Sequence, residues 1–297
     1  MKTCPYCGKK YPDEALVCAI DQEPLDPKLP KTAGLPLEEE ARQWIETSFA
    51  WLLKEFGADE FLKRPTLLPE RAFFPDPYEG TEESVLKVVD RVCGYMGIDP
   101  ESVTVEFLLD ANETAKKHRL GIEESSGAAG LYFSSAASEE KQRIAINVSQ
   151  FKHPSNLVAT IAHELGHVLL LGGGRISRED QRHELLTDLC TVFFGLGIFT
   201  ANGAFQFSQW GGGGRHGWRA ARMGYLSEGM FAYSLAAYAW MRGESKPAWS
   251  RCLAMNVGCY FKECLKYLED GNSTALVKLA GPDSKPPSTA SAVRSRQ

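Results

Sequence analysis

The spacing of apolar residues predicts two helices near the start of the main part of the chain. From Leu37 to Gly57, large apolar residues recur about every 3.6 positions, as in a helix with one buried face. They are Trp44, Ile45, Phe49, Leu52, Leu53 and Phe56. A second amphipathic helix is expected from about Thr81, a suitable N-cap, to Met96. Residues 37–100 are therefore interpreted as a helical N-terminal part.

Strand patterns follow, and helices return after them. Runs rich in β-branched or aromatic residues predict strands at Val103–Leu109, Gly130–Ser134 and Arg143–Val148. Pro154 suits the first position of a helix that is expected to end at the glycines 172–174. The rest is predicted to be mainly helical, interrupted by a glycine-rich loop at 210–218. This order of elements predicts the α+β class.

The two ends of the chain differ from its middle. Residues 1–26 are rich in turn residues and contain cysteines, and residues 27–36 are interpreted as a linker because prolines and a glycine interrupt any helix there. Residues 281–297 lack apolar periodicity and are expected to be a disordered tail. A single domain is therefore predicted at 37–280.

Composition is that of an ordinary globular protein, with 43% hydrophobic and 24% charged residues. The net charge of -5 makes a nucleic-acid partner unlikely and gives no sign of a membrane partner. The apolar runs Leu189–Phe199 and Met230–Met241 are shorter than the roughly 20 residues that a membrane span needs. With no secretory signal visible and an uneven distribution of cysteines, reduced thiols and a cytoplasmic location are expected.

The sequence His163-Glu164-Leu165-Gly166-His167 carries the main chemical signal. Histidines four positions apart lie on the same face of a helix and can bind one metal ion, and the glutamate between them can activate a water as general base. A surface helix that happens to carry two histidines is the plainer alternative. The apolar residues of this helix, the preceding strand and an acidic pair further on all count against it.

A catalytic zinc site needs a third protein ligand, and the next helix can supply it. Glu184 and Asp188 are four positions apart and share one face. Glu184 is predicted to complete the zinc site, and Asp188 to accept a hydrogen bond from a ligating imidazole. His183 and Asp188 remain rival ligands.

The HExxH motif followed by Glu184-x-x-x-Asp188 resembles the gluzincin group of metallopeptidases. The resemblance covers roughly residues 130–190. It implies a zincin-like domain with a small, mainly antiparallel sheet, an active-site helix that carries HExxH, and a largely helical C-terminal part. It also implies hydrolysis of a peptide bond by water that Glu164 activates, and an edge strand, here at Gly130, Leu131 and Tyr132, that aligns an extended peptide.

A peptidase also needs a group that stabilises the oxyanion of the tetrahedral intermediate. Residues in or just after the glycine-rich loop are the candidates: Arg215, His216 and Tyr225. An ordinary exposed loop with a solvated histidine is an equally good interpretation of this segment.

Cysteines near the N-terminus suggest a second metal site. Cys4, Cys7, Cys18 and Asp21 resemble half of a zinc ribbon in which Asp21 takes the place of a fourth cysteine. Such a segment would take most of its folding energy from a structural zinc and would dock to a protein partner or to the main domain. The alternative, a redox Cys-x-x-Cys motif, needs a preceding strand and a following helix, for which this segment has little room.

The sequence thus predicts a zinc metallopeptidase with one catalytic and one structural zinc ion, acting on a peptide or protein. The alternative is a zincin-fold protein that is non-catalytic or regulates a single target through partner binding. Glu164 argues against a purely structural metal, because such a site needs ligands but no general base.

Overall fold

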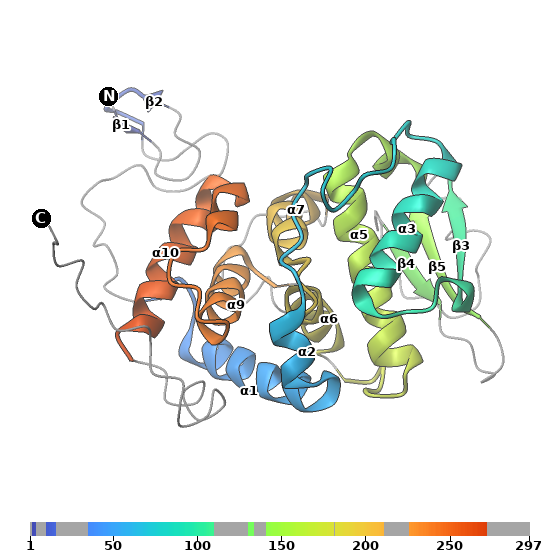
Figure 1. Cartoon of the computed structure of the whole chain (residues 1–297). Helices are drawn as coiled ribbons and strands as arrows, with labels where there is room; N and C mark the ends of the chain where they lie inside the picture. The colour runs from blue at the N-terminus through green and yellow to red at the C-terminus, as the bar shows by residue number, and fades with distance from the viewer. Residues whose placement is uncertain are drawn as a thin grey trace, which may run out of the picture.

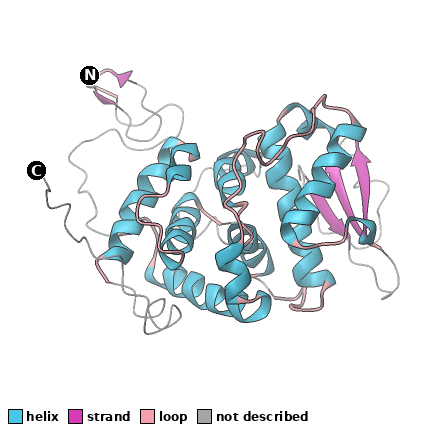
Figure 2. Ribbon diagram, viewed as in Figure 1, coloured by secondary structure: helices cyan, strands magenta, loops and turns pink. Residues whose placement is uncertain are grey.

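The computed structural model describes residues 2–3, 10–15, 35–109, 130–133, 141–180, 182–210 and 226–271. Helices dominate these residues, and a small sheet lies at one end of the helical body (Figures 1 and 2). The predicted α+β class is confirmed.

The helices agree with the apolar pattern. The expected N-terminal helices are α1 (Glu39–Phe56) and α3 (Glu82–Met96), with the short α2 (Ala58–Lys63) between them. Thr81 caps α3: its hydroxyl accepts from the Ser84 N–H, and the Ser84 hydroxyl accepts from the Thr81 N–H. The later helices are α5 (Pro154–His167), α6 (His183–Phe193), α7 (Gly197–Trp210), α9 (Glu228–Met241) and α10 (Met255–Glu269).

The main sheet has the strand order β3-β5-β4, with β3 at Val103–Leu108, β4 at Gly130–Phe133 and β5 at Gln142–Asn147. β3 pairs with β5 in parallel over six residues, and β4 pairs with β5 antiparallel over four. The expectation of a mainly antiparallel sheet was therefore wrong, and the sheet is mixed. Strand direction depends on the path of the long connection after β3, which apolar periodicity does not reveal. Near the N-terminus, β1 (Lys2–Thr3) and β2 (Lys10–Tyr11) form a separate antiparallel pair.

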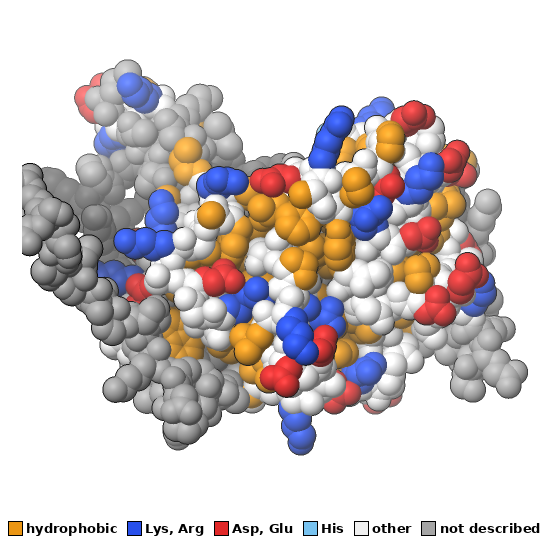
Figure 3. Space-filling model, viewed as in Figure 1, with side chains coloured by type: hydrophobic (Ala, Val, Ile, Leu, Met, Phe, Trp, Pro, Cys, Tyr) orange, Lys and Arg blue, Asp and Glu red, His pale blue; other side chains and the backbone are white. Residues whose placement is uncertain are grey.

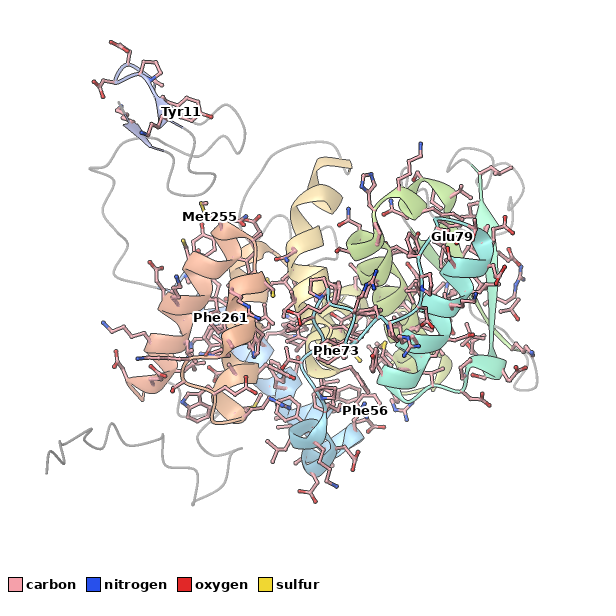
Figure 4. The ribbon with its side chains drawn as sticks, turned by 45° about the horizontal axis from the view of Figure 1, so that its top comes forward. Tyr11, Phe56, Phe73, Glu79, Met255 and Phe261 are labelled. Atoms are coloured by element: carbon pink, nitrogen blue, oxygen red, sulfur yellow. The ribbon has the colours of Figure 1, made fainter. Side chains whose placement is uncertain are left out.

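One continuous hydrophobic core joins the N-terminal helices to the rest of the domain. α1 packs against α6 and α9, and α3 packs against α5. The Phe56 ring of α1 contacts Phe193 in a tilted and Phe194 in an edge-to-face arrangement at the end of α6. Phe261 of α10 is buried. Figure 4 labels Phe56 and Phe261 on these two helices. Residues 37–100 are thus built into the core that supports α5 and α6.

The surface carries charges of both signs. On the face in Figure 3, lysine and arginine side chains alternate with acidic ones around apolar patches. Within the described residues, no helix is both long enough and apolar enough to cross a membrane.

A buried carboxylate links α1 to α9. Glu46 is 1% exposed, and its Oε1 accepts hydrogen bonds from Arg42 Nη1 and from the Tyr233 hydroxyl, each at 2.5 Å. We expect Arg42→Ala to lower the free energy of unfolding by about 3 kcal/mol, because it leaves a buried charge without its cation. Urea denaturation followed by circular dichroism measures this change.

Lys63→Ala is the matched control for Arg42→Ala. Lys63 pairs with Glu60 at 3.2 Å on α2, but both side chains are largely exposed. Removal of such a pair is expected to cost less than about 0.5 kcal/mol. Equal effects of the two substitutions would show that the Glu46 charge does not depend on Arg42.

Candidate metal centre and active site

The HExxH residues lie on a buried stretch of α5. α5 packs against α3, α6, α7 and the strands β4 and β5, and every residue from Leu157 to His167 is buried. The helix continues as a π-helical turn at Val168–Gly172 before the chain leaves it. Irregular turns of this kind often occur at functional sites.

Both histidines of the motif face the first turn of α6. His163 Nε2 lies 3.0 Å and His167 Nε2 lies 3.2 Å from Glu184 Oε2. The two helices come this close because residue 166 is glycine: a Cβ there would lie 2.8 Å from Thr187 Cγ2. Glu184 is also well placed electrostatically, since the N-terminal end of a helix favours a negative charge.

The outer nitrogens of both imidazoles have their own partners. Asp188 Oδ1 lies 2.9 Å from His163 Nδ1, and Thr187 Oγ1 lies 3.2 Å from His167 Nδ1. The Thr187 hydroxyl donates its single proton to the His183 carbonyl, so it accepts from His167. Both rings therefore carry a proton on Nδ1. Each Nε2 atom faces Glu184 Oε2, where it can donate a proton to the carboxylate or, without that proton, offer its lone pair to a metal ion.

Three electron-pair donors thus converge, and such a set requires a cation, either a proton or a metal ion. Burial lowers the pKa of His163, but the hydrogen bonds to Asp188 and Glu184 outweigh it and raise this pKa well above its usual value. Burial likewise raises the pKa of Glu184, but hydrogen bonds from His163 and His167 outweigh it and hold this pKa below its usual value.

The donor set fits zinc. The ligand atoms of His163, His167 and Glu184 lie within 4.8 Å of one another. Tetrahedral zinc with ligands at about 2.1 Å separates neighbouring ligand atoms by roughly 3.4 Å. The two distances to Glu184, 3.0 and 3.2 Å, are slightly shorter than this separation, and the bound of 4.8 Å on the whole set is longer, so small shifts of the three side chains would bring them to tetrahedral geometry.

Glu164 lies beside this group without being part of it. Its side chain is buried, and none of the described residues forms a hydrogen bond with its carboxylate. Burial raises the pKa of Glu164 to about 8. A buried carboxylate that no protein group occupies is suited to exchange protons with water or substrate.

The strand β4 passes directly over Glu164. A Cβ on Gly130 would lie 2.6 Å from Glu164 Oε1 and 2.7 Å from Thr160 Cγ2, so only glycine leaves room for the carboxylate. Two residues along the strand, the ring of Tyr132 stacks on His167 at 5.8 Å between centroids. The Tyr132 hydroxyl is held by Gln142 Oε1 at 2.6 Å. Among the described residues, β4 is an edge strand of the sheet, because it pairs with β5 on one side only.

Comparison of the chain with protein-family models, curated proteins and solved structures found no match. The functional argument therefore rests on the site itself.

The structure brings together most of the site residues predicted from the sequence: His163, Glu164, His167, Glu184, Asp188, Gly130 and Tyr132. Leu131 lies on β4, but its side chain is outside the described part. The oxyanion candidates Arg215, His216 and Tyr225, and the ribbon residues Cys4, Cys7, Cys18 and Asp21, also lie outside the described residues.

Two contacts were not predicted from the sequence. Thr187 supports His167, although its position three residues after Glu184 places it on the same helical face and could have indicated this role. Leu226 donates its backbone N–H to Asp188 Oδ2 at 2.9 Å, which ties the start of the α9 segment to the support of His163. A backbone contact of this kind leaves no signal in the sequence.

Proposed function

We propose that this protein is a zinc-dependent peptidase whose catalytic zinc is held by His163, His167 and Glu184. The observation that supports this most strongly is the placement of Glu164: a buried carboxylate, not hydrogen-bonded by any described residue, beside three converging ligand atoms. Zinc bound there would supply a Lewis acid that polarises the peptide carbonyl and makes water easier to deprotonate.

The protein's own residues then have distinct roles. Glu164 takes a proton from the attacking water and passes it to the amide nitrogen as the carbon–nitrogen bond breaks. Asp188 and Thr187 hold the two imidazoles in the ligating tautomer. The backbone of β4 forms hydrogen bonds with an extended peptide, and this pairing brings the scissile bond close to Glu164.

We also propose a second, structural zinc ion, bound by Cys4, Cys7, Cys18 and Asp21. The segment that contains these residues is expected to bind a protein partner. We also propose a cytoplasmic location. The described cysteines support it, since Cys93, Cys190, Cys252, Cys259 and Cys264 are all free thiols.

Removal of zinc tests the proposal. We expect the chelator-treated protein to lose at least 90% of its cleavage of a fluorescence-quenched peptide library, because water without a Lewis acid is a poor nucleophile. Two added equivalents of zinc, enough for the catalytic and the structural site, should restore the rate, and magnesium, which prefers oxygen ligands, should not. Zinc binding without any cleavage would instead favour the regulatory or non-catalytic alternative.

A further inference from the structure

An arginine reaches the β4 strand from the loop that joins the two metal-binding helices. Arg178 Nη2 donates to the Tyr132 carbonyl oxygen at 3.3 Å, and its guanidinium carbon lies 5.4 Å from the centre of the Tyr132 ring. The Arg178 side chain is exposed. No carboxylate of the described chain forms an ion pair with it, whereas Arg175 in the same loop is paired with Glu55.

This position is close to the metal centre. The same Tyr132 ring stacks on the His167 imidazole, with 5.8 Å between the ring centres, so Arg178 and His167 both contact Tyr132. An extended peptide advances about 3.3 Å per residue. A peptide along β4 would therefore bring Arg178 within reach of groups roughly two or three residues from the scissile bond.

We propose that Arg178 determines specificity by binding a carboxylate of the peptide substrate. This inference rests on the proposed peptidase function. A guanidinium has five N–H donors arranged to bind a carboxylate in a bidentate way, so Arg178 can keep its bond to the Tyr132 carbonyl and still bind an acid. It also stays charged at any physiological pH, so the preference does not depend on titration of this residue.

The carboxylate can come from two sources: an acidic side chain or the free C-terminus of a short peptide. Peptides that differ only by Asp or Asn at each of three positions on either side of the cleaved bond test the first source. The same peptides with a free or an amidated C-terminus test the second. A carboxylate from either source could accept hydrogen bonds from the Arg178 guanidinium.

The experiment compares kcat/KM for each peptide pair in the zinc-loaded full chain and in three variants. We expect wild type to favour the carboxylate member of at least one pair by roughly tenfold, a typical gain for a partly exposed charged hydrogen bond. Arg178→Gln should bring this ratio close to one, and Arg178→Lys should keep part of it. Arg182→Gln, an exposed arginine of the same loop, should leave it unchanged.

Binding provides a second measurement that does not need turnover. Fluorescence anisotropy with Glu164→Gln should show the same preference for the carboxylate peptide, and Glu164→Gln/Arg178→Gln should lose it. If wild type cleaves peptides but Arg178→Gln has the same ratios, the role of Arg178 is wrong and the peptidase proposal stands. If Glu164→Gln cleaves every peptide that wild type cleaves, or if neither cleaves any, the peptidase proposal fails and the role of Arg178 fails with it.

Discussion

Glu164→Gln is expected to keep its zinc and to lose between about 100- and 10,000-fold in kcat, the usual contribution of a general base. Glu164 is not one of the three converging ligands, so the metal should stay. Gln has nearly the same shape, so it should fit under Gly130 where the carboxylate now lies. What disappears is the ability to accept a proton from water.

Zinc content by elemental analysis and steady-state kinetics on one peptide measure the two halves of this prediction. Glu179→Gln is the control, because it makes the same chemical change at an exposed position of the neighbouring loop. It should behave as wild type. A Glu164→Gln protein with a normal kcat would show that Glu164 is not the general base, and would contradict the proposed peptidase mechanism.

Metal binding also bears on the pKa of Glu164. Burial raises the pKa of this carboxyl to about 8 in the protein without metal. A nearby dication favours the ionised form, so the pKa should fall when zinc binds. The base would then be ionised at neutral pH mainly in the metal-loaded protein, so occupation of the metal site would also prepare Glu164 to accept a proton.

The elements of the fold could be predicted where a repeating pattern carries the information. Helices α1 and α3 follow the spacing of apolar residues, and Thr81 caps α3 as expected. The spacing of four within His163–His167 and within Glu184–Asp188 likewise placed each pair on one helical face. These are local regularities, which a single sequence records directly.

The relations between elements could not be predicted in this way. The direction of β3 against β5 depends on the path of the connecting chain, and the sheet was wrongly expected to be mainly antiparallel. The passage of Gly130 over Glu164 and the reach of Arg178 to Tyr132 join segments that lie far apart in the sequence. Such contacts arise from packing, and the local sequence around Gly130 or Arg178 does not indicate them.

The sequence also left the third ligand open among Glu184, His183 and Asp188, and geometry now favours one of them. Glu184 Oε2 lies close to both imidazole Nε2 atoms. Asp188 is engaged on the far side of His163, where it contacts Nδ1. His183 lies at the margin: its ring centre is 5.8 Å from that of His167, and its Nδ1 is 3.5 Å from Glu184 Oε1.

Glu184→Ala is therefore expected to weaken zinc binding at this site by more than the roughly 100-fold that loss of a residue supporting a ligand can cost. It removes the only negatively charged ligand of the proposed triad and leaves two neutral imidazoles. Isothermal titration calorimetry of the metal-depleted chain measures the affinity. Cobalt absorption spectra report independently whether a tetrahedral site forms.

His183→Ala separates the remaining possibilities. Its imidazole is adjacent to Glu184 but outside the converging group, so its loss should change the zinc affinity less than tenfold. Circular dichroism should first show that both variants are folded. If His183→Ala loses the metal and Glu184→Ala retains it, the third ligand is the histidine, and Glu184 instead serves only to hold His163 and His167 by hydrogen bonds.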